Sequence, residues 1–128
     1  WFGKDAWCRG IVDVAVVGRA KITALDWKTG KKKLDSTQLK LFAGLLFSHY
    51  PEVEVVHTGF VWLKEPKGKM IDRDKFERDD IPSIWQEFLP RVRRLEVAYE
   101  KDSWPARPSG LCRKYCAVTS CEFNGRKQ

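Results

Sequence analysis

Two short apolar stretches near the start of the chain alternate with polar positions in the manner of paired β-strands. They read GIVDVAVV and AKITALDWK, and Gly18-Arg19 separates them. Glycine at the first of two loop residues is typical of a tight hairpin, because that position needs a positive φ angle. A two-residue loop predicts three cross-strand pairs: Val17 with Ala20, Ala15 with Ile22, and Asp13 with Ala24.

This pairing divides the two strands into a polar face and an apolar face, because successive side chains of a strand point to opposite sides. The polar face carries Asp13, Asp26 and Lys28 together with Ala24. The other face predicts the contact with the protein core. Its members are Val12, Val14, Val16, Thr23, Leu25 and Trp27.

The rest of the chain alternates between helix-like and strand-like patterns. Apolar side chains surround most of the helix expected from Ser36 to His49, so this helix should be largely buried. The period of Ile81 to Tyr99 predicts a second helix, which Pro90 should kink or divide. Val53 to Leu63 and Lys69 to Phe76 predict two strands joined by a Pro-Lys-Gly turn. This order predicts an α/β fold with a central mixed β-sheet flanked by helices.

Asp13, Asp26 and Lys28 are the candidate catalytic residues. Two like charges about 4 Å apart repel by about 4 kcal/mol at an effective dielectric constant near 20. A divalent cation such as Mg²⁺ or Mn²⁺ between the aspartates removes this repulsion, since such ions prefer oxygen ligands. Lys28 would then orient or deprotonate a water molecule, or stabilise charge in the transition state. The alternative interpretation is a solvated sheet face on which Lys28 balances the aspartates.

Gln38 allows two interpretations. The run Asp35-Ser-Thr-Gln38 resembles a capping box, in which the side chain three residues into the helix bonds back to the capping residue. A contact between Gln38 and a substrate phosphate is compatible with the same position.

Composition favours a single domain, residues 1–128, that binds a polyanion. The formal net charge is +7 and the pI is near 9.4, so DNA is the obvious partner. Lys31, Lys32 and Lys33 follow the second predicted strand and would hold a phosphate backbone; a solvated basic surface is the alternative. No segment is apolar over the length of a membrane span and no secretory signal is visible, which favours a cytoplasmic location without membrane association.

The four cysteines suggest a second, structural group. Cys112, Cys116 and Cys121 lie within ten residues, a spacing that favours a ligand cluster over a disulfide framework, and Cys8 is the only candidate for a fourth ligand. Thiolates bind Zn²⁺ or iron–sulfur clusters. Free thiols, or a disulfide formed on oxidation, are the alternatives. In each case the group would clip the tail, residues 105–128, onto the core.

The ordered motifs GIVD, D-W-K-T-G and QLKLFA resemble the nuclease core of the PD-(D/E)xK superfamily, in its RecB-like and phage-type exonuclease branch. The resemblance implies a restriction-endonuclease-like fold in which Asp13 and Asp26 bind the metal. It also implies that Lys28 positions water and that the Trp27 backbone carbonyl is a further metal ligand. The family's Q-x-x-x-Y motif retains Gln38, whereas its tyrosine is replaced by phenylalanine at position 42.

Two departures accompany this resemblance. Relatives with a [4Fe–4S] cluster have their first cysteine well ahead of the nuclease strands, whereas Cys8 lies five residues before Asp13. The family also has a preceding helix with a His or Glu that completes the site, and the sequence begins at Trp1 without room for it. We therefore expect weakened metal binding if that helix is absent.

Together these patterns predict a Mg²⁺- or Mn²⁺-dependent nuclease that hydrolyses DNA phosphodiester bonds, with [4Fe–4S] or Zn²⁺ at the cysteines. A phage protein in the host cytoplasm fits this prediction. One alternative is a non-catalytic nucleic-acid-binding module that retains the nuclease fold. Another is a structural zinc or iron–sulfur protein in which the carboxylates are incidental.

Overall fold

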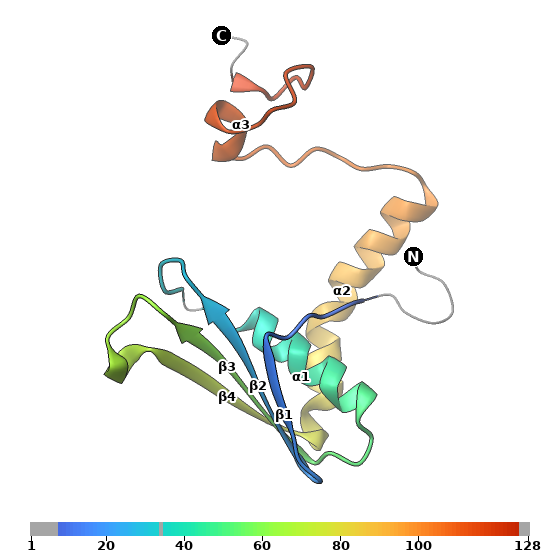
Figure 1. The fold of residues 1–128 in the computed structure, drawn as a ribbon. Helices are drawn as coiled ribbons and strands as arrows, with labels where there is room; N and C mark the ends of the chain where they lie inside the picture. Colours follow the sequence, from blue (N-terminus) through green and yellow to red (C-terminus); the bar gives the residue numbers. More distant parts are fainter. Residues whose placement is uncertain (1–7, 34, 126–128) are drawn as a thin grey trace. The chain divides into compact units, whose positions relative to one another are not determined.

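The computed structural model describes residues 8–33 and 35–125, which form a four-stranded sheet and three α-helices (Figure 1). The chain divides into two compact units, residues 1–93 and 94–128, and each is described by itself. The elements are β1 (Val14–Val17), β2 (Lys21–Lys28), α1 (Thr37–His49), β3 (Val55–Trp62), β4 (Ile71–Glu77), α2 (Ile81–Glu100) and α3 (Gly110–Lys114), with 3₁₀ turns η1 (Lys67–Lys69) and η2 (Arg78–Asp80).

The sheet is mixed, as the sequence predicts. Its strand order is β1-β2-β3-β4, and the β1–β2 and β3–β4 pairs are antiparallel. The central β2–β3 pair is parallel, and α1 forms the crossover that a parallel connection requires. The coarse α/β prediction and the predicted β3–β4 hairpin are therefore confirmed.

The register of the first hairpin differs from the prediction by two residues. Val17 pairs with Ile22, and the N–H of Gly18 donates to the carbonyl of Lys21 at 2.9 Å. This bond closes the turn over Arg19 and Ala20, one residue later than predicted, and Gly18 does not adopt the positive φ expected of it. A shift of two preserves which side chains share a face. It also brings Asp13, one residue before β1, level with Asp26.

The sequence predicted the wrong face of the sheet as the core. Helix α1 and the first part of α2 pack on the face of Ile22 and Ala24, which is also the face of Asp26. On the opposite face Val16 is 65% exposed and Trp27 is 46% exposed. The main core cluster consists of Ile22, Ala43, Phe47, Val53, Val56, Phe76, Ile84 and Phe88.

Both long helices lie where the sequence places them. Helix α1 buries most of one side, as predicted. Helix α2 runs without a break through Pro90, so of the two predicted outcomes, a kink or a division, the division is wrong. Pro90 is exposed, a position at which the missing N–H removes one backbone bond without disturbing packing.

The second unit is held by local polar contacts. Ser109 caps α3, with its hydroxyl accepting from the N–H of Leu111 at 3.3 Å. The buried Asn124 donates to the carbonyls of Cys116 and Val118 at 3.2 and 2.9 Å. The predicted packing of the tail, residues 105–128, on the core stays a prediction. Among the described helices none combines the length and apolarity of a membrane span.

Candidate metal and nucleic-acid site

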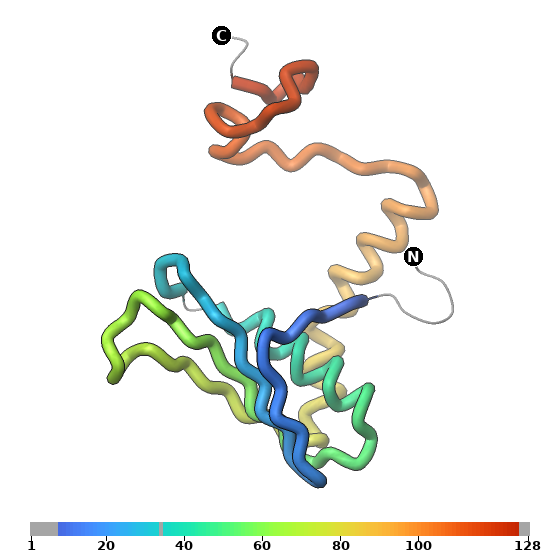
Figure 2. The backbone as a smooth tube through the Cα atoms, viewed as in Figure 1, coloured from blue at the N-terminus to red at the C-terminus, as the bar shows by residue number. Residues whose placement is uncertain are grey.

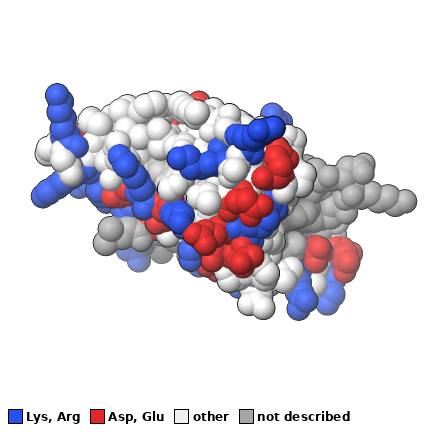
Figure 3. All heavy atoms as spheres, turned by 90° about the horizontal axis from the view of Figure 1, so that it is seen from below, with Lys and Arg blue, Asp and Glu red and all other residues white. Residues whose placement is uncertain are grey.

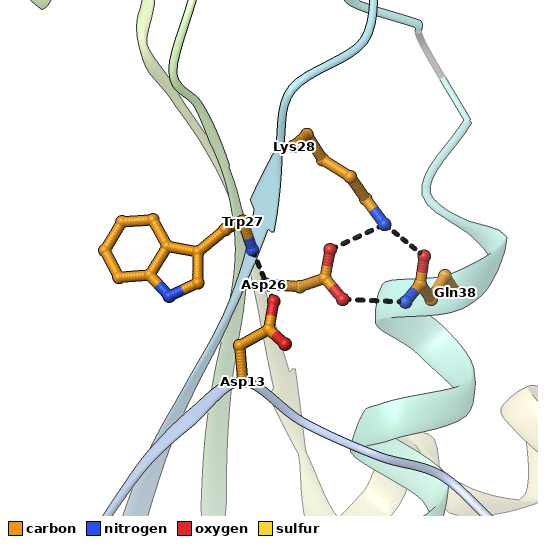
Figure 4. A network of polar contacts seen from close by, with 5 residues as sticks. All are labelled: Asp13, Asp26, Trp27, Lys28 and Gln38. Carbon is orange, nitrogen blue, oxygen red and sulfur yellow. Dashed lines mark hydrogen bonds and ion pairs between the residues drawn. The ribbon is translucent and has the colours of Figure 1, made fainter.

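Three polar side chains from β2 and α1 close a ring at one end of the sheet (Figure 4). Gln38 donates from Nε2 to Asp26 Oδ1 at 3.0 Å and accepts at Oε1 from Lys28 Nζ at 2.8 Å. Lys28 Nζ lies 2.5 Å from Asp26 Oδ2. The strand pleat sets this geometry, because residues two apart on β2 project from the same face toward the start of α1.

Asp26 is the buried charge of this ring. The residue is only 7% exposed, and burying a carboxylate is unfavourable without compensating partners. Its Oδ2 has the Lys28 ammonium beside it, yet among the described residues no donor is aligned for a hydrogen bond to that oxygen. The Lys28 ammonium also lies 4.8 Å from the centre of the Phe60 ring. Asp26 Oδ2 is therefore ion-paired with Lys28 but accepts no aligned hydrogen bond from the described residues.

Gln38 reaches the ring because it does not cap its helix. Ser36 is the N-cap, and instead of a capping box, Asp35 accepts from the N–H of Thr37 at 2.9 Å. Hydrogen bonding from Thr37 lowers the pKa of Asp35. The capping-box interpretation of Gln38 is therefore wrong, since its amide bridges Asp26 and Lys28.

Asp13 lies next to Asp26, but its carboxylate has a different partner (Figure 4). Asp13 Oδ2 accepts from the backbone N–H of Trp27 at 2.8 Å, and the residue is exposed. The N–H and carbonyl of a paired strand residue point to the same side. The Trp27 carbonyl therefore faces the Asp13 side of β2, as a metal ligand at that position would require.

The donor set at this end of the sheet fits a hard cation in part. Two carboxylates and a carbonyl are oxygen ligands of the kind that Mg²⁺ and Mn²⁺ prefer. To bind such a cation, Asp26 Oδ2 would exchange its ion pair with Lys28 for the metal. Within residues 8–33 and 35–125, no three His, Cys, Asp or Glu side chains form a group able to hold a metal ion. A cation here would therefore rely on Asp13, Asp26, the Trp27 carbonyl and non-protein ligands.

The three lysines of the β2–α1 loop do not share one role. Lys32 Nζ lies 2.6 Å from Asp72 Oδ1 and donates to the carbonyl of Lys69 at 3.0 Å, so it is bound to β4 and the turn before it. Lys31 and Lys33 are exposed. They line a cleft of about 300 Å³ together with Lys28, Gly30, Asp35, Gln38, Phe60 and Trp62.

Sequence reasoning missed the residues that support this cleft from β3 and β4. Parallel pairing places Phe60 beside Asp26 and Trp62 beside Lys28. The Trp62 indole donates to Asp72 Oδ2 at 2.8 Å. Hydrogen bonding from Lys32, and then from Trp62, lowers the pKa of Asp72. The alternating aromatic positions of β3 were the available signal, but only the parallel register shows which residues they face.

All four cysteines are free thiols. Cys112 Sγ accepts a weak hydrogen bond from the N–H of Ser109 at 3.4 Å, which helps to begin α3. Burial raises the pKa of the Cys8 thiol. Cys8 belongs to the first unit and the other three to the second, so a shared cluster stays a prediction.

Comparison of the chain with protein-family models, with curated proteins and with solved structures found no match. Function is therefore inferred from the residues and their geometry.

Proposed function

We propose that this chain is a divalent-metal-dependent nuclease that hydrolyses DNA phosphodiester bonds. The observation that carries the proposal is the ring of Asp26, Lys28 and Gln38, with Asp13 beside it, next to a cleft lined by exposed lysines. An acid, an ammonium group and an amide meeting at the edge of a cleft are the groups expected where a phosphodiester is attacked by water.

Asp13, Asp26 and the Trp27 carbonyl would hold the Mg²⁺ or Mn²⁺ ion. Such an ion supplies Lewis acidity and neutralises the charge that develops on the phosphate. The exposed position of Asp13 allows its carboxylate to exchange the Trp27 N–H for another partner. Asp26 contributes the oxygen that has no aligned donor.

The remaining groups of the ring position and stabilise the reactants. Lys28 carries an ammonium group held between Asp26 and Gln38, so it would donate hydrogen bonds to water and stabilise negative charge as it develops in the transition state. Gln38 holds the Lys28 ammonium through Oε1. Lys31 and Lys33 would bind the flanking phosphates, since both line the same cleft as Lys28.

A restriction-endonuclease-like core is part of the same proposal. Its support is the mixed sheet, in which β2 supplies Asp26 and Lys28 and the crossover helix α1 supplies Gln38. The order of these residues along the chain matches the order of the PD-(D/E)xK motifs.

A non-catalytic DNA-binding module is the second candidate, and one observation favours it. The polar groups of the site already satisfy one another, because the Lys28 ammonium lies beside Asp26 Oδ2 and Asp13 binds the Trp27 amide. In a site arranged in this way each carboxylate has a partner without any bound cation. The lysines of the cleft would then hold DNA without cleaving it.

The test is incubation with linear and with circular DNA in the presence of Mg²⁺, Mn²⁺ or EDTA. We expect degradation that requires the metal and that Lys28→Ala reduces by about 10²- to 10³-fold, the usual effect of removing one group that stabilises transition-state charge. Lys40→Ala is the matched control, because Lys40 makes a surface ion pair with Glu87 at 2.7 Å and is comparably exposed.

The two candidates give different results in this assay. Binding of DNA in EDTA without cleavage in either metal would refute the nuclease and support the binding module. Cleavage that survives Lys28→Ala unchanged would refute the role of Lys28. Circular dichroism of each variant establishes that the fold is retained.

A further inference from the structure

The connection between β3 and β4 lies at the same end of the sheet as the candidate site (Figure 2). Lys32 holds the β2–α1 loop to this connection through the carbonyl of Lys69 and through Asp72 at the start of β4. The N–H of Leu63 donates to the carbonyl of Lys28 at 2.9 Å, which joins the connection to the end of β2. The two loops therefore form one continuous rim beside the cleft.

This rim is positively charged. Residues 29–36 and residues 63–70 each contain three lysines and one acidic residue. Lys64, Lys67 and Lys69 are exposed, and no hydrogen bond or ion pair engages their ammonium groups within the described part of the chain. Viewed from below, Lys and Arg side chains project from the side where Figure 1 shows the β3–β4 connection, whereas Asp and Glu gather nearer the middle (Figure 3).

We propose that the β3–β4 connection is a second phosphate-binding element, in which Lys64, Lys67 and Lys69 continue the track of Lys31 and Lys33 along a nucleic-acid backbone. This inference rests on the nucleic-acid role proposed for the site and names the surface that would hold the strand beyond it. Lys32 acts as a positioning residue, since its ammonium joins the two loops.

Chemistry of this kind recognises backbone charge and not base identity. Ammonium groups on flexible stems bind phosphate as point charges, and each contact releases counterions from the nucleic acid. The logarithm of the association constant should therefore fall with the logarithm of the salt concentration, by about 0.9 for each phosphate contact on duplex DNA.

The experiment measures binding of a fluorescein-labelled DNA duplex in EDTA between about 50 and 200 mM salt. We expect Lys64→Gln/Lys67→Gln to reduce the magnitude of the salt slope by about 1.8, which corresponds to two contacts. The control Arg19→Gln/Lys21→Gln removes the same charge at the opposite end of β2, about 23 Å from Lys28 at the usual rise per strand residue. At physiological salt that distance exceeds the screening length of about 8 Å.

An unchanged slope in the loop variant, or an equal loss in the control, would overturn the inference, because net charge would then explain the binding. Tighter binding to phosphatidylserine vesicles than to DNA, lost in the same variant, would overturn the choice of nucleic acid. The use of EDTA separates this result from the proposed activity. Metal-dependent cleavage together with an unchanged salt slope in the loop variant would refute only the phosphate-binding role of the rim. The expected salt slopes without any cleavage would refute only the proposed hydrolysis.

Discussion

Replacement of Lys28 by methionine tests whether the Asp26–Lys28 contact stabilises the fold. Methionine keeps an apolar stem near the Phe60 ring but removes the ammonium that lies 2.5 Å from Asp26 Oδ2. The buried carboxylate then loses its only cationic neighbour among the described contacts, while Gln38 still donates to Oδ1. Loss of one partner from a buried pair is unfavourable mainly because the remaining charge is left uncompensated.

The structure sets the expected size of this effect. Breaking a fully buried pair costs about 3–5 kcal/mol, but the side chains of Lys28 and Asp26 are 28% and 10% exposed, so solvent offsets part of the loss. We expect a decrease in the free energy of unfolding of about 2–3 kcal/mol. For a chain of this size that decrease corresponds to a lowering of Tm by about 8–12 °C.

A double-mutant cycle with Asp26→Asn isolates the pair. The combination Asp26→Asn/Lys28→Met removes both charges, so it should be more stable than the sum of the single changes predicts, by about 1–2 kcal/mol. Urea denaturation followed by circular dichroism measures each term. A Lys28→Met protein within about 0.5 kcal/mol of the wild type, or additive single changes, would refute the account of Asp26 as a buried charge that depends on Lys28.

The same variant reports on metal binding without any measurement of activity. Lys28→Met removes the ammonium that competes for Asp26 Oδ2, so Mg²⁺ should raise its unfolding midpoint more than that of the wild type. At one hundred times the dissociation constant, a ligand specific for the folded state adds about 2.7 kcal/mol. Equal effects of Mg²⁺ on the two proteins would contradict a cation site that includes Asp26.

Other features of the fold give independent predictions. Hydrogen bonding from Lys32 lowers the pKa of Asp72. The Asp72 carboxylate therefore contributes its full stability above the pKa of the unfolded chain, and this contribution is lost as pH falls through the lower pKa of the folded state. Tm should drop more steeply below about pH 4 in the wild type than in Asp72→Asn. Gly59→Ala should lower the urea midpoint by the equivalent of about 1–3 kcal/mol, because a Cβ there would lie 2.9 Å from the carbonyl oxygen of Asp72 and 3.1 Å from Leu25 Cδ2; an unchanged midpoint would show that β4 yields easily. Asn124→Ala should accelerate hydrogen exchange in the second unit while the sheet stays protected, since the carbonyls of Cys116 and Val118 lose a buried donor. Faster exchange in the sheet would mean that the two units are coupled.

The limits of sequence-based prediction are clearest in the β1–β2 hairpin. Alternation identified both strands and placed Asp13 on the same face as Asp26. The glycine suggested a turn over Gly18 and Arg19, whereas the chain turns over Arg19 and Ala20. The buried face was assigned wrongly because β-branched residues crowd the other side. Burial depends on which face α1 crosses, and the alternation of side chains does not contain that information.

Helix α1 shows the same limit for the site. Its position and its burial follow from its apolar residues, so the sequence predicted them. The role of Gln38 did not follow, because the local pattern fits a capping box equally well. Only the parallel β2–β3 pairing, which orients the start of α1 toward Lys28, decides where the amide points.

The edge position of β1 gives the two aspartates different mobility. Among the strands that the structure describes, β1 has four residues and pairs with β2 alone, whereas β2 is paired on both sides. Short edge strands separate from a sheet more readily than central ones. Asp13 would therefore leave the site and return to it as β1 frays, while Asp26 stays in the site. An ion bridging both carboxylates would escape at the rate of that fraying, so residues of β1 remote from the chemistry would determine its residence time.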